Sequence, residues 1–294
     1  MTTESPLSLA DREREYSPSS CIGGNYAPFL QAYAQRSEAA LRDASFRRDL
    51  AYGERPANRL DLCLPAQRTQ PGPVPLLVFI HGGYWQELSK ASSLFAAPDC
   101  VAAGWAFAAI GYTLAPTATI ADMVLECRQA LRWLHANADR YGIDARRIVV
   151  AGSSAGAHLA AMASLRSWPG GADLPPGLPA AAVLVSGVYD LSPLVGTSIA
   201  APLDLAAESA AAVSPRLQPL AGFPPSAVCW GEVETAAFKR QSREFADAVA
   251  AAGAPPPVVF EVPARNHFDV ILDLATPGTP LGDATRRMVA PGTA

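Results

Sequence analysis

The sequence predicts an α/β fold with an open, mostly parallel sheet covered by helices on both faces. Short apolar runs with β-branched residues recur along the chain, as expected for strands that are buried on both faces. Segments with helical periodicity separate these runs, and this alternation implies right-handed strand–helix–strand crossovers. Half of the 294 residues are apolar and only 17% are charged, a composition typical of a chain with a large core.

The candidate strands differ in their polarity pattern. Residues 60–64 alternate between polar and apolar side chains, which is typical of an edge strand in an antiparallel pair. The later runs are continuously apolar and are expected to form buried parallel strands; they are 76–80, 105–110, 147–150, 181–186, 227–230 and 258–262.

Two helices have clear sequence signals. Thr119 and Asp122 resemble a capping box, and the apolar periodicity that follows them continues until Gly142. A second periodic segment begins at Phe238 and stops at Gly253. Further helices are expected in two regions that would form a small cap over a site.

The domain prediction is therefore a single unit over residues 1–294. Its cap would come from about residues 20–48 and 191–224, and the chain shows neither a linker nor an internal repeat.

Charge and cysteine content exclude several classes of protein. With 23 basic and 27 acidic residues, the chain has a net charge of −4 and no excess of positive charge for nucleic acid. Its five scattered cysteines indicate reduced thiols instead of a disulfide framework or a zinc site. No apolar stretch is long enough to span a membrane, and the first twenty residues do not resemble a secretory signal. We expect a cytoplasmic protein without metal or cofactor.

The strongest functional signal is the segment Gly152-Ser153-Ser154-Ala155-Gly156. It follows an apolar strand and precedes good helix formers, which is the context of a nucleophile elbow. Glycines flank Ser154 at both G-x-S-x-G positions, whereas Ser153 would be flanked by alanines, so Ser154 is the predicted nucleophile.

A second signal, His81-Gly82-Gly83-Tyr84-Trp85, directly follows the strand at 76–80. In folds with a nucleophile elbow, such a loop supplies part of an oxyanion hole. The amide after the nucleophile supplies the rest. The predicted donors are the backbone amides of Gly83, Tyr84 and Ala155.

The general base follows by elimination among four histidines. His81 belongs to the glycine loop, His135 lies on the polar side of a helix, and His158 follows the nucleophile by one helical turn. His267, after the last predicted strand, satisfies the expected chain order of serine, acid and histidine.

The acid is not determined by position alone. Glu232 and Glu234 follow one predicted strand, and Asp190 follows the strand before it. Each of the three could orient the base.

Six blocks of the chain resemble the arylformamidase (kynurenine formamidase) family of α/β-hydrolases. The matching blocks are Tyr16-Ser-Pro-Ser19, His81-Gly-Gly-Tyr-Trp-Gln86, Gly152-x-Ser154-Ala-Gly-Ala-His-Leu-Ala-Ala-Met162, Leu184-Val-Ser-Gly-x-Tyr-Asp-Leu-x-Pro-Leu194, Phe238-x-x-Gln-Ser242 and His267-Phe-Asp269. The resemblance implies Ser154 as nucleophile, His267 as base and Glu234 as acid. The family usually has aspartate at the acid position and often has histidine where this chain has Ser153.

The resemblance implies hydrolysis of a small acyl group, formyl above all, from an aryl amide such as N-formylkynurenine. Trp85, Trp230 and Phe268 lie near the predicted site in sequence and are expected to line an aromatic pocket. One alternative is a carboxylesterase that acts on short acyl or aryl esters, and another is a non-catalytic binding protein on the same scaffold. The expected partner is a small-molecule substrate, without nucleic acid or membrane; a homodimer is compatible with the sequence, which does not determine the oligomeric state.

Overall fold

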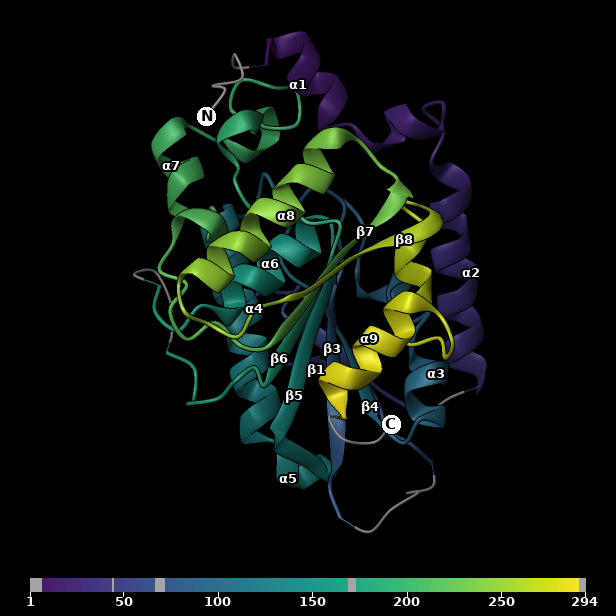
Figure 1. Cartoon of the computed structure of the whole chain (residues 1–294). Helices are drawn as coiled ribbons and strands as arrows, with labels where there is room; N and C mark the ends of the chain where they lie inside the picture. The colour runs from purple at the N-terminus through teal and green to yellow at the C-terminus, as the bar shows by residue number, and fades with distance from the viewer. Residues whose placement is uncertain (1–6, 44, 67–71, 169–172, 291–294) are drawn as a thin grey trace.

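The computed structural model describes residues 7–43, 45–66, 72–168 and 173–290 and is built around an eight-stranded sheet (Figure 1). Residue 44, inside one predicted cap region, and both ends of the predicted 1–294 domain lie outside the described residues. The strands are β1 (Phe46–Ala51), β2 (Arg59–Cys63), β3 (Val74–Ile80), β4 (Ala106–Ile110), β5 (Ile143–Ser153), β6 (Ala181–Val185), β7 (Ser226–Val233) and β8 (Val258–Asn266).

The sheet has the order β1-β2-β4-β3-β5-β6-β7-β8. β2 pairs antiparallel with β1 and β4, and the remaining neighbours are parallel. The predicted mostly parallel sheet is thereby confirmed. Strand β3 is buried along its whole length, as its continuous apolar sequence requires.

Two expectations about the sheet edges were wrong. The strand predicted at 60–64 is antiparallel but internal, because β1 covers its outer side; β1 has little apolar alternation to signal a strand. The run at 258–262 forms the other edge, so much of it is exposed, and Val258 and Val259 each retain over 40% of their accessible surface.

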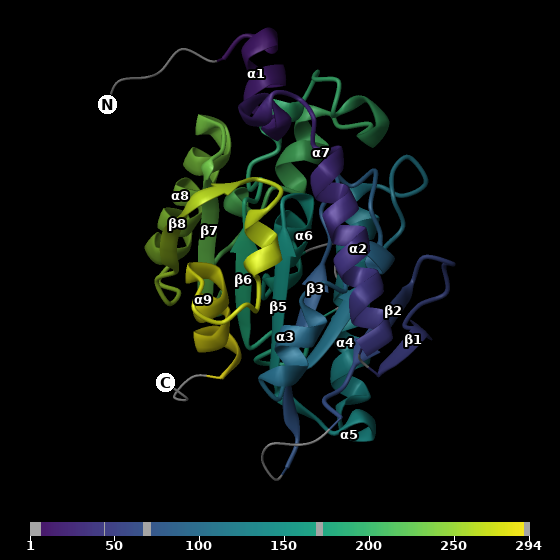
Figure 2. The same cartoon turned by 90° about the vertical axis from the view of Figure 1, so that its right-hand side faces the viewer.

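Helices cover both faces of the sheet. On one face lie α4 (Ile120–Ala136), α6 (Ala155–Ser164) and α8 (Ala236–Ala251); on the other lie α2 (Ala27–Asp43), α3 (Ala97–Ala102) and α9 (Pro280–Val289) (Figures 1 and 2). Two separate apolar clusters fill the layers between these helices and the sheet. The three-layer arrangement matches the prediction.

The predicted capping box is present at the start of α4. Thr119 Oγ1 accepts a hydrogen bond from Asp122 N at 3.1 Å, and Asp122 Oδ2 accepts one from Thr119 N at 3.0 Å. The helix expected to run to Gly142 is divided, because α4 ends at Ala136 and the short α5 (Ala138–Tyr141) follows. Gly142 then ends α5 in the left-handed region, with a φ of 67°.

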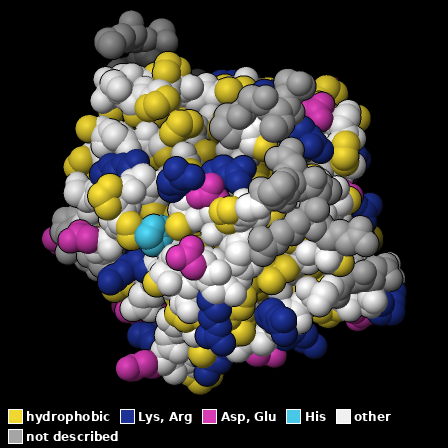
Figure 3. All heavy atoms as spheres, turned by 90° about the horizontal axis from the view of Figure 1, so that it is seen from below, with side chains coloured by type: hydrophobic (Ala, Val, Ile, Leu, Met, Phe, Trp, Pro, Cys, Tyr) yellow, Lys and Arg dark blue, Asp and Glu magenta, His cyan; other side chains and the backbone are white. Residues whose placement is uncertain are grey.

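Short helices gather near the carboxyl ends of the parallel strands. They comprise α1 (Leu9–Glu15), η1 (Pro18–Ile22), η3 (Ser192–Leu194), η4 (Ala201–Leu203), α7 (Ala207–Ala212) and η5 (Pro215–Leu217); η2 (Lys90–Ser92) and η6 (Val270–Asp273) lie in loops beside the sheet. At the opposite end of the molecule, basic and acidic side chains are interspersed over the surface (Figure 3). Among the described helices, none has both the length and the apolarity needed to cross a membrane.

Candidate active site

Ser154 occupies a sharp turn between β5 and α6. Its backbone has a φ of 56° and a ψ of −122°, a strained conformation for a residue with a side chain. The flanking glycines make this turn possible: a Cβ on Gly152 would lie 2.2 Å from the carbonyl oxygen of Gly156, and one on Gly156 would lie 2.1 Å from that of Ile80. The turn therefore has the geometry expected of a nucleophile elbow.

The loop after β3 lies directly against this serine. A Cβ on Gly82 would come within 3.2 Å of Ser154 Cβ, so the loop approaches the elbow without an intervening side chain. Gly83, with a φ of 93°, and Tyr84, with a φ of 46°, turn the backbone along the same cavity that Ser154 lines. Of the residues proposed as oxyanion donors, Gly83 and Tyr84 thus line the same cavity as Ser154, and Ala155 follows Ser154 directly in the chain.

His267 and Glu234 form a buried hydrogen-bonded pair. His267 Nδ1 donates to Glu234 Oε2 at 2.9 Å, and both residues are less than 10% exposed. The other carboxylate oxygen, Oε1, accepts hydrogen bonds from Ser186 Oγ and Gly231 N, each at 2.6 Å. An ionised carboxylate is an acceptor only, and here three donors surround it. With Nδ1 engaged, Nε2 of His267 is left to accept a proton.

The two alternative acids have other partners. Asp190 accepts a 2.7 Å hydrogen bond from Arg216, and Glu232, which is exposed, accepts one from the backbone N of Ala264 at 2.7 Å. Burial alone would raise the pKa of Asp190, but hydrogen bonds from Arg216 and Ser192 outweigh it and hold that pKa below its usual value. Of the three candidates left open by position, Glu234 is the one joined to His267.

Two other histidines, His81 and His158, are buried and contact other residues of the core. His81 stacks on Tyr112, and His158 Nε2 donates to the carbonyl oxygen of Val213 at 2.6 Å. Burial lowers the pKa of each imidazole to about 4, so both are neutral at physiological pH. The fourth, His135, lies in the last turn of α4, away from the cavity.

Ser154 and His267 line one cavity at the carboxyl ends of β3 and β5. Within the described residues their side chains make no direct hydrogen bond, and such contacts are often loose before substrate binds. Phe268 also lines the cavity and stacks on Tyr26 and Phe29 of the N-terminal segment, with ring centroids 5.2 and 5.7 Å apart. The remaining walls are mostly apolar, and they include Pro18, Leu30, Tyr33, Phe79, Phe95 and Ile271.

The expectation that Trp85 and Trp230 line this cavity was wrong. Trp85 is fully buried beside α6, and its indole N–H donates to His158 Nδ1 at 3.2 Å. Trp230 lies on β7 and donates to Glu261, with Arg243 over its ring. Each indole N–H needs a partner when it is buried, and both partners lie away from the cavity.

The two predicted cap regions contribute differently. The N-terminal region forms α2, from which Leu30 and Tyr33 reach the cavity. Residues 191–224 do form short helices, but none of the described residues lining the cavity belongs to them. Of the two predicted cap regions, the N-terminal one is therefore the one that lines the cavity among the described residues.

Comparison with known proteins agrees with this geometry. Kynurenine formamidase from Danio rerio is 33% identical to this chain over 284 residues, which cover 91% of the chain and 92% of the zebrafish protein. This chain belongs to the kynurenine formamidase family. It is accordingly a hydrolase with the α/β-hydrolase fold.

Two further similarities and one family model are consistent with that assignment. A crystal structure described as a candidate thioesterase from Silicibacter sp. TM1040 has a TM-score of 0.78 and 30% identity, and the match covers 93% of this chain and 98% of that protein. Esterase LipC from Mycobacterium tuberculosis is 36% identical over 156 residues, covering 51% of this chain and 38% of LipC. The family model BD-FAE matches residues 60–169, which contain the glycine loop and the elbow.

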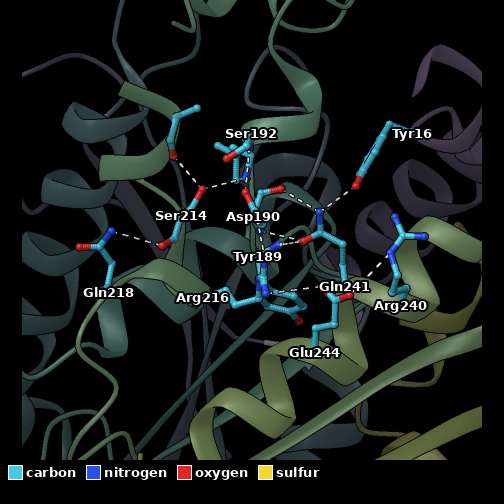
Figure 4. A network of polar contacts seen from close by, with 12 residues as sticks. Tyr16, Tyr189, Asp190, Ser192, Ser214, Arg216, Gln218, Arg240, Gln241 and Glu244 are labelled. Carbon is cyan, nitrogen blue, oxygen red and sulfur yellow. Dashed lines mark hydrogen bonds and ion pairs between the residues drawn. The ribbon is translucent and has the colours of Figure 1, made fainter. Parts of the chain in front are cut away.

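In this member of the kynurenine formamidase family, a network of polar contacts joins α8 to the loop after β6 and to the N-terminal segment (Figure 4). Gln241 of α8 is its centre. Its Oε1 accepts from the backbone N–H groups of Tyr189 and Asp190, both at 2.7 Å, and its Nε2 donates to the Asp190 carbonyl oxygen and the Tyr16 hydroxyl. The Tyr16 carbonyl oxygen in turn accepts from the Tyr84 hydroxyl. The network thus links the loop after β6 to the residue predicted to donate to the oxyanion.

Replacing Gln241 with alanine is expected to destabilise the fold by about 3 kcal/mol, because two buried backbone N–H groups and a tyrosine hydroxyl lose their partner. The measurement is urea unfolding of Gln241→Ala against wild type. Gln129→Ala, on the exposed side of α4, is the matched control and should change stability by less than about 0.5 kcal/mol. A loss below 1 kcal/mol at Gln241 would contradict the role given to this network.

Several residues at the site were not found from the sequence, among them Ser186, Tyr33 and Glu87. Ser186 holds the Glu234 carboxylate, Tyr33 lines the cavity from a helix over 200 residues away from His267, and Glu87 lines it from the glycine loop. Ser186 has a faint signal, since it ends the apolar run at 181–186. Nothing local to Tyr33 points to the site.

Proposed function

We propose that the protein is a serine hydrolase that removes a formyl group from an aryl amine, with N-formylkynurenine as its substrate. The observation that carries this proposal is the 33% identity to a kynurenine formamidase over nearly the full length of both chains. The elbow serine and His267, which line one mostly apolar cavity, support it chemically, together with the hydrogen bond from His267 to the buried Glu234.

In the proposed first step, Ser154 Oγ attacks the formyl carbon while Nε2 of His267 takes the hydroxyl proton. Glu234 holds the imidazole with its Nδ1–H bonded and stabilises the cation that forms. The carbonyl oxygen becomes negative, and the backbone amides of Gly83, Tyr84 and Ala155 donate to it. Each such donor contributes about 3–4 kcal/mol to lowering the barrier.

The aryl amine then leaves with the proton that His267 holds, and Ser154 remains formylated. Water attacks this ester with His267 again as the base, which releases formate and restores the serine. Phe268 and the apolar wall beside it would hold the aromatic leaving group, since their rings offer flat apolar surface.

A carboxylesterase activity is the competing function, and the local similarity to esterase LipC favours it. The two activities share the same machinery, so substrate preference separates them. The test compares kcat/KM for N-formylkynurenine with kcat/KM for p-nitrophenyl acetate on the purified protein. We expect the formamide to be the better substrate in spite of its less reactive carbonyl. Turnover of the ester alone would overturn the formamidase proposal.

A further inference from the structure

Glu87 places a carboxyl group beside the predicted oxyanion hole. Its Cγ would lie 2.9 Å from a Cβ on Gly83, so its side chain passes directly over that glycine. The backbone N of Glu87 donates to the Gly83 carbonyl oxygen at 3.0 Å, which fixes the start of the side chain. Glu87 lines the same cavity as Ser154 and His267 and is exposed to solvent.

No described residue supplies a cation for this carboxylate. The other cavity-lining side chains are apolar, hydroxyl or imidazole groups, and none is a lysine or arginine. Lys90, the basic residue nearest to Glu87 along the sequence, forms ion pairs with two aspartates instead. Its Nζ lies 2.8 Å from Asp49 Oδ1 and 2.8 Å from Asp61 Oδ1. Glu87 itself takes part in no ion pair or side-chain hydrogen bond among the described residues.

Without a positive partner, the Glu87 carboxylate would destabilise the transition state of the proposed reaction. The transition state develops negative charge at the neighbouring donors, and two like charges at close range in a partly apolar cavity repel each other. A positive group on the substrate, placed against Glu87, would remove that repulsion and gain a charge-assisted hydrogen bond. The arrangement therefore suits a cationic leaving group better than a neutral one, and a neutral one better than an anionic one.

We propose that Glu87 is the binding site for an ammonium group on the leaving aryl amine. This inference rests on the proposed function, because it assumes that an aryl amine leaves through this cavity. The ligand class is an aromatic amine whose side chain ends in a primary ammonium, which an amino-acid leaving group such as kynurenine also carries. The subsite would select for the charge of the side chain, whereas Ser154, His267 and Glu234 would act on the acyl group.

The test uses three formanilides that differ only in the ortho side chain: 2-aminoethyl, propyl or 2-carboxyethyl. At neutral pH these are cationic, neutral and anionic. The wild type should show a kcat/KM for the cationic compound about tenfold above that for the neutral one, with the anionic compound slowest. In Glu87→Gln the ratio of cationic to neutral should fall towards one, and in Glu87→Lys the anionic compound should become the preferred member.

Glu208→Gln, an exposed glutamate on α7 away from the cavity, is the control and should keep the wild-type ratios. The same three side chains on phenyl acetate separate this inference from the proposed function. If the acetates show the cation preference but the formanilides are not cleaved, the Glu87 subsite is supported and the formamidase proposal is overturned. Equal rates for cationic and neutral compounds in wild type, or a full preference that persists in Glu87→Gln, would overturn the subsite.

Discussion

Alanine at Ser154 is expected to lower kcat by about 10⁶-fold, the loss of the whole nucleophilic pathway. The buried His267–Glu234 pair would have no hydroxyl to deprotonate, and only binding and the oxyanion donors would assist attack by water. Ser154 is part of the strained elbow, but alanine keeps the Cβ and removes only the hydroxyl. We therefore expect the fold to survive the change. The measurement is kcat on N-formylkynurenine, or on p-nitrophenyl acetate if the ester is the better substrate.

Covalent labelling gives an independent measurement of the same prediction. A fluorophosphonate probe should label wild type and should not label Ser154→Ala. Ser153→Ala is the matched control, since Ser153 lies at the end of β5 beside the cavity and lacks the flanking glycines. Labelling that is lost in Ser153→Ala and kept in Ser154→Ala would mean that the wrong serine has been assigned. An unlabelled wild type would instead favour the binding-protein alternative.

The elbow was predictable from sequence because its signal is local. A strand, two glycines and a helix occur within about fifteen residues, and the steric requirement on Gly152 comes from Gly156, four residues further along the chain. The position of His267 beside the same cavity as Ser154 was also predictable, since only four histidines exist and chain order eliminates three. Such arguments need no knowledge of distant contacts.

The carboxylate that bonds to His267 could not be chosen from position, because the choice depends on tertiary contacts. Glu232 and Glu234 are two residues apart at the end of β7, yet Glu232 is exposed and Glu234 is buried against His267. What separates them is the pair of donors, Ser186 and Gly231, that holds one oxygen of Glu234. Ser186 lies at the end of another strand, so only the folded sheet brings it into contact.

The prediction that Trp85 and Trp230 line an aromatic pocket was wrong for a related reason. Trp85 and Trp230 are near the site in sequence, but nearness along the chain does not determine which way a side chain points. Trp85 points towards His158 in α6, and Trp230 towards Glu261 of β8. Two residues that do line the cavity with Phe268, Leu30 and Tyr33, come from α2, and no pattern in that helix predicts its partner.

Glutamine at Glu234 is expected to reduce kcat by about 10⁴-fold, although the side chain keeps its size and shape. Two donors, Ser186 Oγ and Gly231 N, face Oε1. An amide must therefore place its carbonyl oxygen there, because its NH₂ group would meet those donors head-on. The NH₂ group is then forced towards His267 Nδ1, which must become an acceptor. The proton moves to Nε2, and the imidazole can no longer take a proton from Ser154.

Aspartate at position 234 separates the effect of the His267 tautomer on activity from the effect of the carboxylate's exact placement. Glu234→Asp keeps the charge but is one methylene shorter, so it would lose some of its three hydrogen bonds without imposing the wrong tautomer on His267. We expect it to retain far more activity than Glu234→Gln. Both variants are measured for kcat and for thermal unfolding on the same preparation. Equal losses of kcat in the two variants would show that the geometry of the carboxylate matters and the tautomer of His267 does not. A loss of kcat below tenfold in Glu234→Gln would mean that another carboxylate is the acid.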